Sequence, residues 1–282
     1  MKKIILKIAL QAIRIRLNAL SYISKERAGE KGFKIFSKPR KGKLTADDET
    51  FLDSAEKETI IFENINIQTY LWRGDENKKI LLAHGWESNS ARWKPLIGML
   101  KNKNYTVLAL DAPAHGASGS KIFTQILYAE MIHQVAKKHC PQILVGHSAG
   151  GFAISYFFNK YRPVQVKKII LLAPVSDNRV VFDLYFNFLR TNARVKSGFY
   201  DFFKKKYGNP EALIVSEFAK DFSVKALIIH DKNDEIVPYS QSEKIKAAWE
   251  NSELILTENL GHSLRKDIVY NKVMNFLDVN EN

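Results

Sequence analysis

The sequence predicts an α/β fold in which helices cover both faces of a mostly parallel central sheet. Short, almost wholly apolar runs are each followed by a segment long enough for a helix. These runs are Ile80–Ala83, Thr106–Leu110, Ile143–Val145, Ile169–Leu172, Ala226–Ile229 and Leu254–Leu256. Continuous apolar strands indicate burial on both faces, as in a parallel sheet between helices. Ahead of them, Ile60–Phe62 and Ile67–Trp72 are expected to pair antiparallel around a turn near Glu63-Asn64.

Composition favours a folded protein with one large domain or two small ones. The chain has 282 residues, of which 45% are hydrophobic and 11% aromatic, enough to bury a sizeable core. The single cysteine, Cys140, excludes an intramolecular disulfide, and no Cys/His cluster has the spacing of a zinc site. A single cysteine without a disulfide partner is consistent with a reducing compartment. We therefore expect a cytoplasmic protein.

The positive charge is concentrated at the start of the sequence. The net charge is +13, but residues 1–43 hold thirteen Lys or Arg against two acids, a charge of +11. The rest of the chain therefore carries only +2. A nucleic-acid-binding protein more often spreads basic residues over a folded face, so no nucleic acid partner is expected.

The segment Ile4–Ile23 is typical of an amphipathic helix. The polar stripe comprises Lys3, Lys7, Gln11, Arg14 and Asn18, and the apolar side comprises Leu6, Ala9, Leu10, Ile13, Leu17 and Leu20, with Arg16 inside it. Its charges interrupt it too often for a signal peptide or a spanning helix. Two interpretations remain: the helix packs on the folded body, or residues 1–23 contact an anionic membrane at the inner face.

Two domains are expected. Residues 1–43 form the basic helical extension and its linker, and residues 44–282 form the α/β domain. Between Pro174 and Asp221 no strand pattern occurs, and aromatic residues are frequent. We expect two or three inserted helices there, at about residues 175–221.

The motif Gly146-His147-Ser148-Ala149-Gly150 is the sharpest sign of chemistry. This G-x-S-x-G follows the run Ile143–Val145 and precedes a helix-like stretch, Gly151–Tyr161. A serine on such a strand–turn–helix junction is held in a strained conformation at the strand end, and small flanking residues let strand and helix approach closely. Ser148 is therefore the predicted nucleophile.

A serine nucleophile needs a base, and the base needs an orienting acid. His262 follows the last predicted strand, where a loop can fold over the carboxyl edge of the sheet, and is the predicted base. Asp234 lies in the loop after Ala226–Ile229 and is the predicted acid. Asp231 is closer to the strand and is interpreted as a turn-former, and Asp177 is the remaining candidate.

Two backbone N–H groups are expected to stabilise an oxyanion. One belongs to Ala149, the residue after the nucleophile, and the other to Trp86 in the loop His84-Gly85-Trp86. The Trp86 ring and His147 are the residues predicted to contact substrate.

These motifs resemble the α/β-hydrolase superfamily, in its serine hydrolase branch. His84-Gly85, Gly146–Gly150, Asp234 before Val237-Pro238, and Gly261-His262 occur in the superfamily's order. The loop Asp111-Ala112-Pro113-Ala114-His115-Gly116-Ala117-Ser118 is similar to its D-x-x-G-H-G-x-S pattern, with Ala114 in place of glycine. The resemblance covers residues 58–280 and implies that the insertion is a helical cap over the active site.

The expected function is hydrolysis of a carboxylic ester or thioester, a small-molecule substrate, through an acyl-enzyme. This chemistry needs no cofactor and no metal. Two alternatives stay open: an acyltransferase that uses the same acyl-enzyme, and a non-catalytic membrane-surface binding protein that retains the fold.

Overall fold

The structure, a computed structural model, describes residues 2–278 and contains two compact units. The helical unit consists of Met1–Lys38 and Asp177–Ile214. The sheet unit consists of Pro39–Ser176 and Val215–Asn282. This grouping differs from the domain boundaries expected from the sequence, because the N-terminal helices pack with the insertion and the division falls at Lys38 rather than after residue 43.

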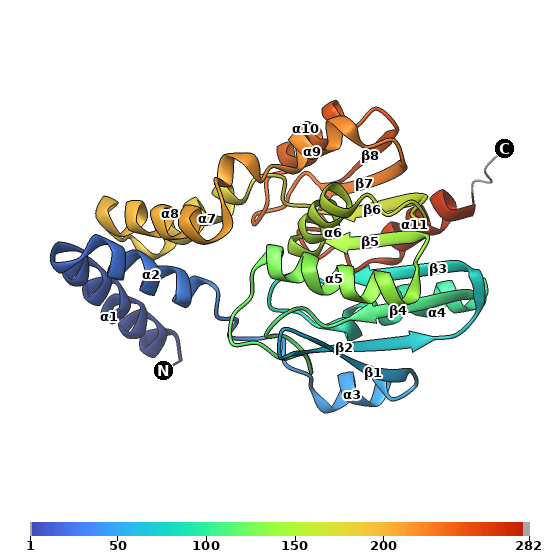
Figure 1. The fold of residues 1–282 in the computed structure, drawn as a ribbon, viewed down its shortest axis with the longest axis horizontal. Coiled ribbons are helices and arrows are strands. Elements are labelled where there is room, and N and C mark those ends of the chain that lie inside the picture. The colour runs from blue at the N-terminus through green and yellow to red at the C-terminus, as the bar shows by residue number, and fades with distance from the viewer. Residues whose placement is uncertain (1, 279–282) are drawn as a thin grey trace. The chain divides into compact units, whose positions relative to one another are not determined.

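The sheet unit is built on an eight-stranded sheet within the described residues, in the order β1-β2-β4-β3-β5-β6-β7-β8 (Figure 1). The strands are β1 (Glu56–Phe62), β2 (Ile65–Trp72), β3 (Asp75–Ala83), β4 (Tyr105–Leu110), β5 (Ile143–His147), β6 (Lys168–Leu172), β7 (Lys225–Asp231) and β8 (Ser252–Thr257). Strand β2 runs antiparallel to both β1 and β4, and the other pairs are parallel. The predicted α/β class and the antiparallel pair are confirmed.

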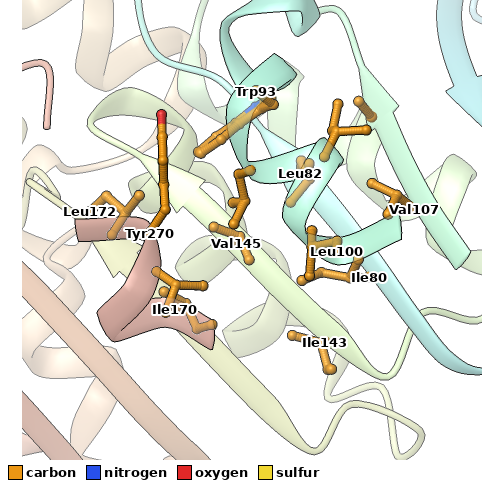
Figure 2. Close-up of a cluster of buried hydrophobic side chains, with 14 of the residues drawn as sticks. Ile80, Leu82, Trp93, Leu100, Val107, Ile143, Val145, Ile170, Leu172 and Tyr270 are labelled. Carbon is orange, nitrogen blue, oxygen red and sulfur yellow. The ribbon is translucent and has the colours of Figure 1, made fainter. Parts of the chain in front are cut away.

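Helices cover both faces of this sheet (Figure 1). They are α3 (Ala46–Leu52), α4 (Lys94–Asn102), α5 (Gln125–His139), α6 (Ala149–Tyr161), α9 (Val215–Phe218), α10 (Ser240–Ala248) and α11 (Asp267–Asp278). Alternate strand residues, such as Leu82, Val145 and Leu172, pack with Leu100 of α4 and Tyr270 of α11 in one buried cluster (Figure 2). Because side chains alternate across a strand, the residues between them face α5 and α6.

The carboxyl ends of the central parallel strands lie in register. Ala83 at the end of β3 pairs with Gly146 of β5, and His147 pairs with Leu172 at the end of β6. Asp231 at the end of β7 pairs with Thr257 at the end of β8. The loops that follow these strands therefore leave the sheet at one edge, where ligands bind in open α/β sheets.

The helical unit joins segments that are far apart in sequence. It contains α1 (Lys2–Ile23), α2 (Lys25–Phe36), α7 (Asn178–Leu189) and α8 (Ala193–Tyr207) (Figure 1). Helices α2 and α8 approach closely at two glycines, since a Cβ on Gly29 would lie 1.9 Å from the backbone carbon of Gly198. Phe33 of α2 contacts Phe199 of α8 at a ring distance of 5.4 Å, and both are buried. Aromatic residues of the insertion therefore form the core of this unit.

The predicted N-terminal helix is present, but its polar stripe is not all exposed. Leu17 is buried, as expected for the apolar side. Asn18, however, accepts a hydrogen bond from the backbone N–H of Asn192, and Arg14 is half-buried. Helix α1 packs on α2, α7 and α8, so the face predicted as polar is partly an interface between helices.

Among the helices that lie between residues 2 and 278, none combines the length and apolar content needed to cross a bilayer.

Candidate active site

Ser148 stands at the junction of β5 and α6, as the motif predicts. Its backbone has φ 52° and ψ −118°, a region that favours glycine and costs a side-chain-bearing residue about 1–3 kcal/mol. Close packing holds the turn: a Cβ on Gly150 would lie 2.3 Å from the carbonyl oxygen of Ala83, and one on Gly146 would lie 2.6 Å from the Cα of Gly151. The two glycines therefore let α6 approach the sheet with its N-terminus at Ser148.

Three predicted side chains form one hydrogen-bonded chain. The Ser148 hydroxyl lies 2.9 Å from Nε2 of His262, and Nδ1 of His262 lies 2.6 Å from Oδ2 of Asp234. A carboxylate only accepts, so Nδ1 carries the proton, and Nε2 is free to accept the hydroxyl proton of Ser148. Ser148 and His262 are 114 residues apart in sequence, and the loops after β5 and β8 bring them together.

The Asp234 carboxylate is buried and also contacts a second histidine, His230. Nε2 of His230 lies 3.1 Å from Oδ2 of Asp234 and 2.9 Å from the carbonyl oxygen of Val237, so this nitrogen is a donor. Burial opposes ionisation of Asp234, but hydrogen bonds from His230 and His262 outweigh it and hold its pKa well below its usual range. Asp234 is therefore a carboxylate at neutral pH.

Sequence reasoning did not assign His230 to the site. Its position four residues before Asp234, in the turn that follows the predicted strand Ala226–Ile229, was the available signal. The imidazole is fully buried, and its Nδ1 lies 2.6 Å from the hydroxyl of Ser242 on α10. His230 therefore connects the acid to the helix behind the loop.

The other candidate acids have different roles. Asp231 accepts hydrogen bonds from the N–H groups of Asn233 and Leu260 and from the Thr257 hydroxyl, which matches the predicted turn-former. Asp177 caps α7 in the helical unit and pairs with Arg179 at 2.7 Å. Neither carboxylate contacts His262 in the hydrogen bonds of the described chain.

Two buried side chains hold the loop that carries His262. His147 donates from Nε2 to the carbonyl oxygen of His262 at 2.9 Å, and Arg92 donates from Nη2 to the carbonyl oxygen of Ser263, also at 2.9 Å. Burial, and then the Arg92 charge, keep the pKa of His147 well below its usual range, so this imidazole is neutral. His147 thus reaches the site through backbone contact, and Arg92 had no signal in the sequence.

The loop after β3 runs beside Ser148. A Cβ on Gly85 would lie 2.7 Å from Nδ1 of His147 and 3.2 Å from the Cβ of Ser148, so a larger residue here would force a shift of these groups. The neighbouring Trp86 ring packs edge-on to Phe123 at 5.2 Å. Ala149 is the first residue of α6, and an N–H at this position has no acceptor within the helix. The two backbone N–H groups predicted to stabilise an oxyanion, those of Trp86 and Ala149, therefore belong to segments at the same edge of the sheet as Ser148.

Two imidazoles connect this loop to the one after β4. His115 accepts a hydrogen bond at Nε2 from the N–H of Glu87, and His84 accepts at Nε2 from the N–H of Ala112, both at 2.9 Å. Their Nδ1 atoms lie 2.8 Å from the carbonyl oxygens of Pro113 and Gly85, respectively. Burial lowers the pKa of each imidazole to about 3, so both imidazoles are neutral and their Nε2 atoms remain hydrogen-bond acceptors.

Over residues 2–278, no three His, Cys, Asp or Glu side chains are grouped as metal ligands.

The sequence matches the profile of the Alpha/beta hydrolase family over residues 80–267, about two thirds of the chain. The chain belongs to this family. Solved members share its fold: Alpha/beta hydrolase domain-containing protein 10 from mouse superposes with a TM-score of 0.66 at 18% identity, covering 79% of this chain and 97% of that one. A structure named as a candidate lipase from Acinetobacter baumannii gives a TM-score of 0.63 at 18% identity, covering 82% and 93%.

Curated relatives of this chain include proteins named as esterases. A candidate esterase/lipase of Mycoplasma genitalium is 30% identical over 101 residues, which is 34% of this chain and 37% of the relative. This chain thus spans little more than a third of that relative's length. The bifunctional esterase/perhydrolase of Acinetobacter calcoaceticus is 24% identical over 247 residues, covering 68% and 88%. These two relatives are thus described as esterases or lipases.

Proposed function

We propose that this chain is a serine hydrolase that cleaves a carboxylic ester or thioester through an acyl-enzyme. The observation that carries the proposal is the continuous contact from the Ser148 hydroxyl through His262 to the Asp234 carboxylate. An alcohol is a weak nucleophile, and a neutral imidazole at 2.9 Å can remove its proton as the oxygen attacks. The names of the relatives favour an ester as the bond cleaved.

In the first half of the reaction, Oγ of Ser148 attacks the carbonyl carbon while its proton moves to Nε2 of His262. Asp234 stays ionised and stabilises the imidazolium by accepting from Nδ1. The N–H groups of Trp86 and Ala149 are assigned to the developing oxyanion, and loss of one such donor typically lowers the rate by ~10²–10³. The imidazolium then protonates the departing alkoxide or thiolate, leaving Ser148 acylated.

In the second half, water replaces the alcohol. Nε2 of His262 takes a proton from water as its oxygen attacks the acyl carbon, and the imidazolium returns that proton to Oγ of Ser148. The products are a carboxylic acid and free enzyme. An alcohol or amine that occupies the place of water would give acyl transfer by the same steps.

The test is turnover of 4-nitrophenyl esters of rising acyl length by the wild type and by Ser148→Ala. We expect hydrolysis of some members and a loss of at least ~10³-fold in the variant, since the nucleophile is removed. Ser155→Ala is the matched control. Ser155 is buried on α6, the helix that begins directly after Ser148, and its hydroxyl donates to the Gly151 carbonyl. This control is expected to retain activity.

Covalent labelling separates catalysis from binding alone. A fluorophosphonate probe should label Ser148 in the wild type and leave Ser148→Ala unlabelled. Equal turnover in both proteins would refute the assignment of the nucleophile. No turnover together with no labelling of the wild type would favour the non-catalytic alternative. Product analysis with an added alcohol distinguishes hydrolysis from acyl transfer.

A further inference from the structure

Helix α1 has apolar residues on two opposite sides. Leu17 is buried on the side that packs within the helical unit. On the other side, Ile8, Ile15 and Tyr22 are 62%, 56% and 73% exposed. These three lie seven residues apart, so they repeat every two turns along one line of the helix. Ile23 extends the line at its end, with 81% of its surface exposed.

We call this line the outer stripe; it consists of Ile8, Ala12, Ile15, Ala19, Tyr22 and Ile23. All six residues are exposed. A continuous apolar line on the surface is unusual in a soluble unit of this size and marks a contact with something apolar. The stripe is also narrow, since every member lies within about a quarter of the helix circumference at 100° per residue.

Cations flank the outer stripe. Arg16 is exposed and lies about 20° beyond Ile23, at one edge of the stripe. At the C-terminal end of α1, the Arg194 guanidinium lies 5.8 Å from the Tyr22 ring centre and donates to the Ser21 carbonyl. Helix α1 contains no acid.

The whole helical unit is basic, and not only its N-terminal helices. Its two segments hold seventeen Lys or Arg against six Asp or Glu, a formal charge of +11, and the rest of the sequence carries +2. The insertion supplies part of this excess, including Lys204-Lys205-Lys206 at the end of α8. The stripe therefore belongs to the strongly charged part of a protein that is otherwise near neutral.

We propose that the outer stripe of α1 binds the surface of an anionic lipid bilayer, with the helix lying along it. Such a surface offers an apolar layer directly below a layer of phosphates, which matches an apolar line with Arg16 at one edge and Arg194 at its C-terminal end. Arginine side chains reach the phosphates while their stems lie against the apolar layer, and a tyrosine is favoured at this boundary. This inference concerns the helical unit alone and does not depend on the proposed reaction.

The test is co-sedimentation of the full chain with vesicles. Wild type should bind vesicles of phosphatidylcholine mixed with phosphatidylglycerol, and binding should weaken as salt is raised, because screening reduces the attraction. It should bind pure phosphatidylcholine far less. Ile8→Gln with Ile15→Gln should lower the partition coefficient by about tenfold per isoleucine, since each loses its apolar contact.

Two controls isolate the stripe. Ile61→Gln with Val164→Gln removes two residues of the sheet unit that are 72% and 98% exposed, and is expected to leave binding unchanged. Arg16→Gln should weaken binding to anionic vesicles by about fivefold and leave binding to phosphatidylcholine unchanged. All five side chains are exposed, so the variants should fold, which circular dichroism checks.

Three results would overturn the proposal. They are no binding of wild type to anionic vesicles, equal binding by Ile8→Gln with Ile15→Gln, and equal loss in the sheet-unit control. Sedimentation velocity without lipid examines a rival occupant, a second copy of the chain. A dimer that dissociates in Ile8→Gln with Ile15→Gln would assign the stripe to self-association instead.

Discussion

His84 and His115 join the loops after β3 and β4, and because both resist protonation in the folded chain, the sheet unit is expected to lose stability in mild acid. Both imidazoles are fully buried and accept a backbone N–H at Nε2. An imidazolium has no acceptor nitrogen, so protonation breaks these hydrogen bonds and leaves a buried charge. The pKa of each is lowered to about 3, mainly by burial.

The direction follows from comparing the folded and unfolded chains. An unfolded histidine has a pKa of about 6.5, so between pH 6.5 and 3 the unfolded chain binds protons that His84 and His115 in the folded chain do not. The contribution of these two histidines to the free energy of unfolding is fully present above pH 6.5. It is lost progressively as the pH is lowered through this window. From pH 7 to pH 5 the loss is about 2 kcal/mol per histidine, or about 4 kcal/mol for the pair.

Asp234 does not contribute over this range. Its folded pKa lies below the unfolded value, so its stabilisation is present above about pH 4 and is lost only below that. The window from pH 7 to pH 5 therefore reports histidines.

Urea denaturation at pH 7 and pH 5, followed by tryptophan fluorescence, measures the effect. Every tryptophan, Trp72, Trp86, Trp93 and Trp249, belongs to the sheet unit, so the signal reports that unit. With a slope of about 2 kcal/mol per M, the pair should lower the midpoint by about 2 M at pH 5, and His147, whose pKa is also lowered by burial, should add to this fall.

His115→Gln should reduce the difference between the two pH values by its own share, about 2 kcal/mol, even though it destabilises the protein at pH 7. His133, half-exposed on α5, supplies the matched control, and His133→Gln should leave most of the difference intact. Equal midpoints at pH 7 and pH 5, or a full difference in His115→Gln, would refute the reasoning.

Three further predictions concern the site itself. His230→Gln removes the second histidine on Asp234 and should lower kcat about tenfold with little change in KM, because the acid loses its orientation; an unchanged kcat would contradict this role. Gly150→Ala should lower stability by at least about 3 kcal/mol in thermal melts, since its Cβ would overlap β3, whereas Gly98→Ala, with open space around it, should be neutral or stabilising. Ser148→Gly should abolish ester turnover and raise stability by about 1 kcal/mol over Ser148→Ala, because φ 52° is strained for both serine and alanine; equal melting temperatures would exclude that strain.

Local patterns in the sequence determined the fold class and the positions of the chemistry-bearing loops. Runs such as Ile143–Val145 and Ala226–Ile229 are strands in the structure because continuous apolar character requires burial on both faces. Parallel strands end at one edge, so Ser148, Asp234 and His262, each just after a strand, could be expected to meet. The structure brings these three side chains within hydrogen-bonding distance.

Only the tertiary structure decided which distant segments share a core. Nothing local indicates that Gly29 and Gly198 face each other, yet this contact joins the N-terminal helices to the insertion. The same packing places Asn18 against Asn192, and it distributes the positive charge over one helical unit rather than an extension. Arg92 and His230 were likewise assigned by contacts across the fold. Helix and strand periods depend on neighbouring residues, whereas contacts between remote segments depend on how whole surfaces fit, which no short pattern encodes.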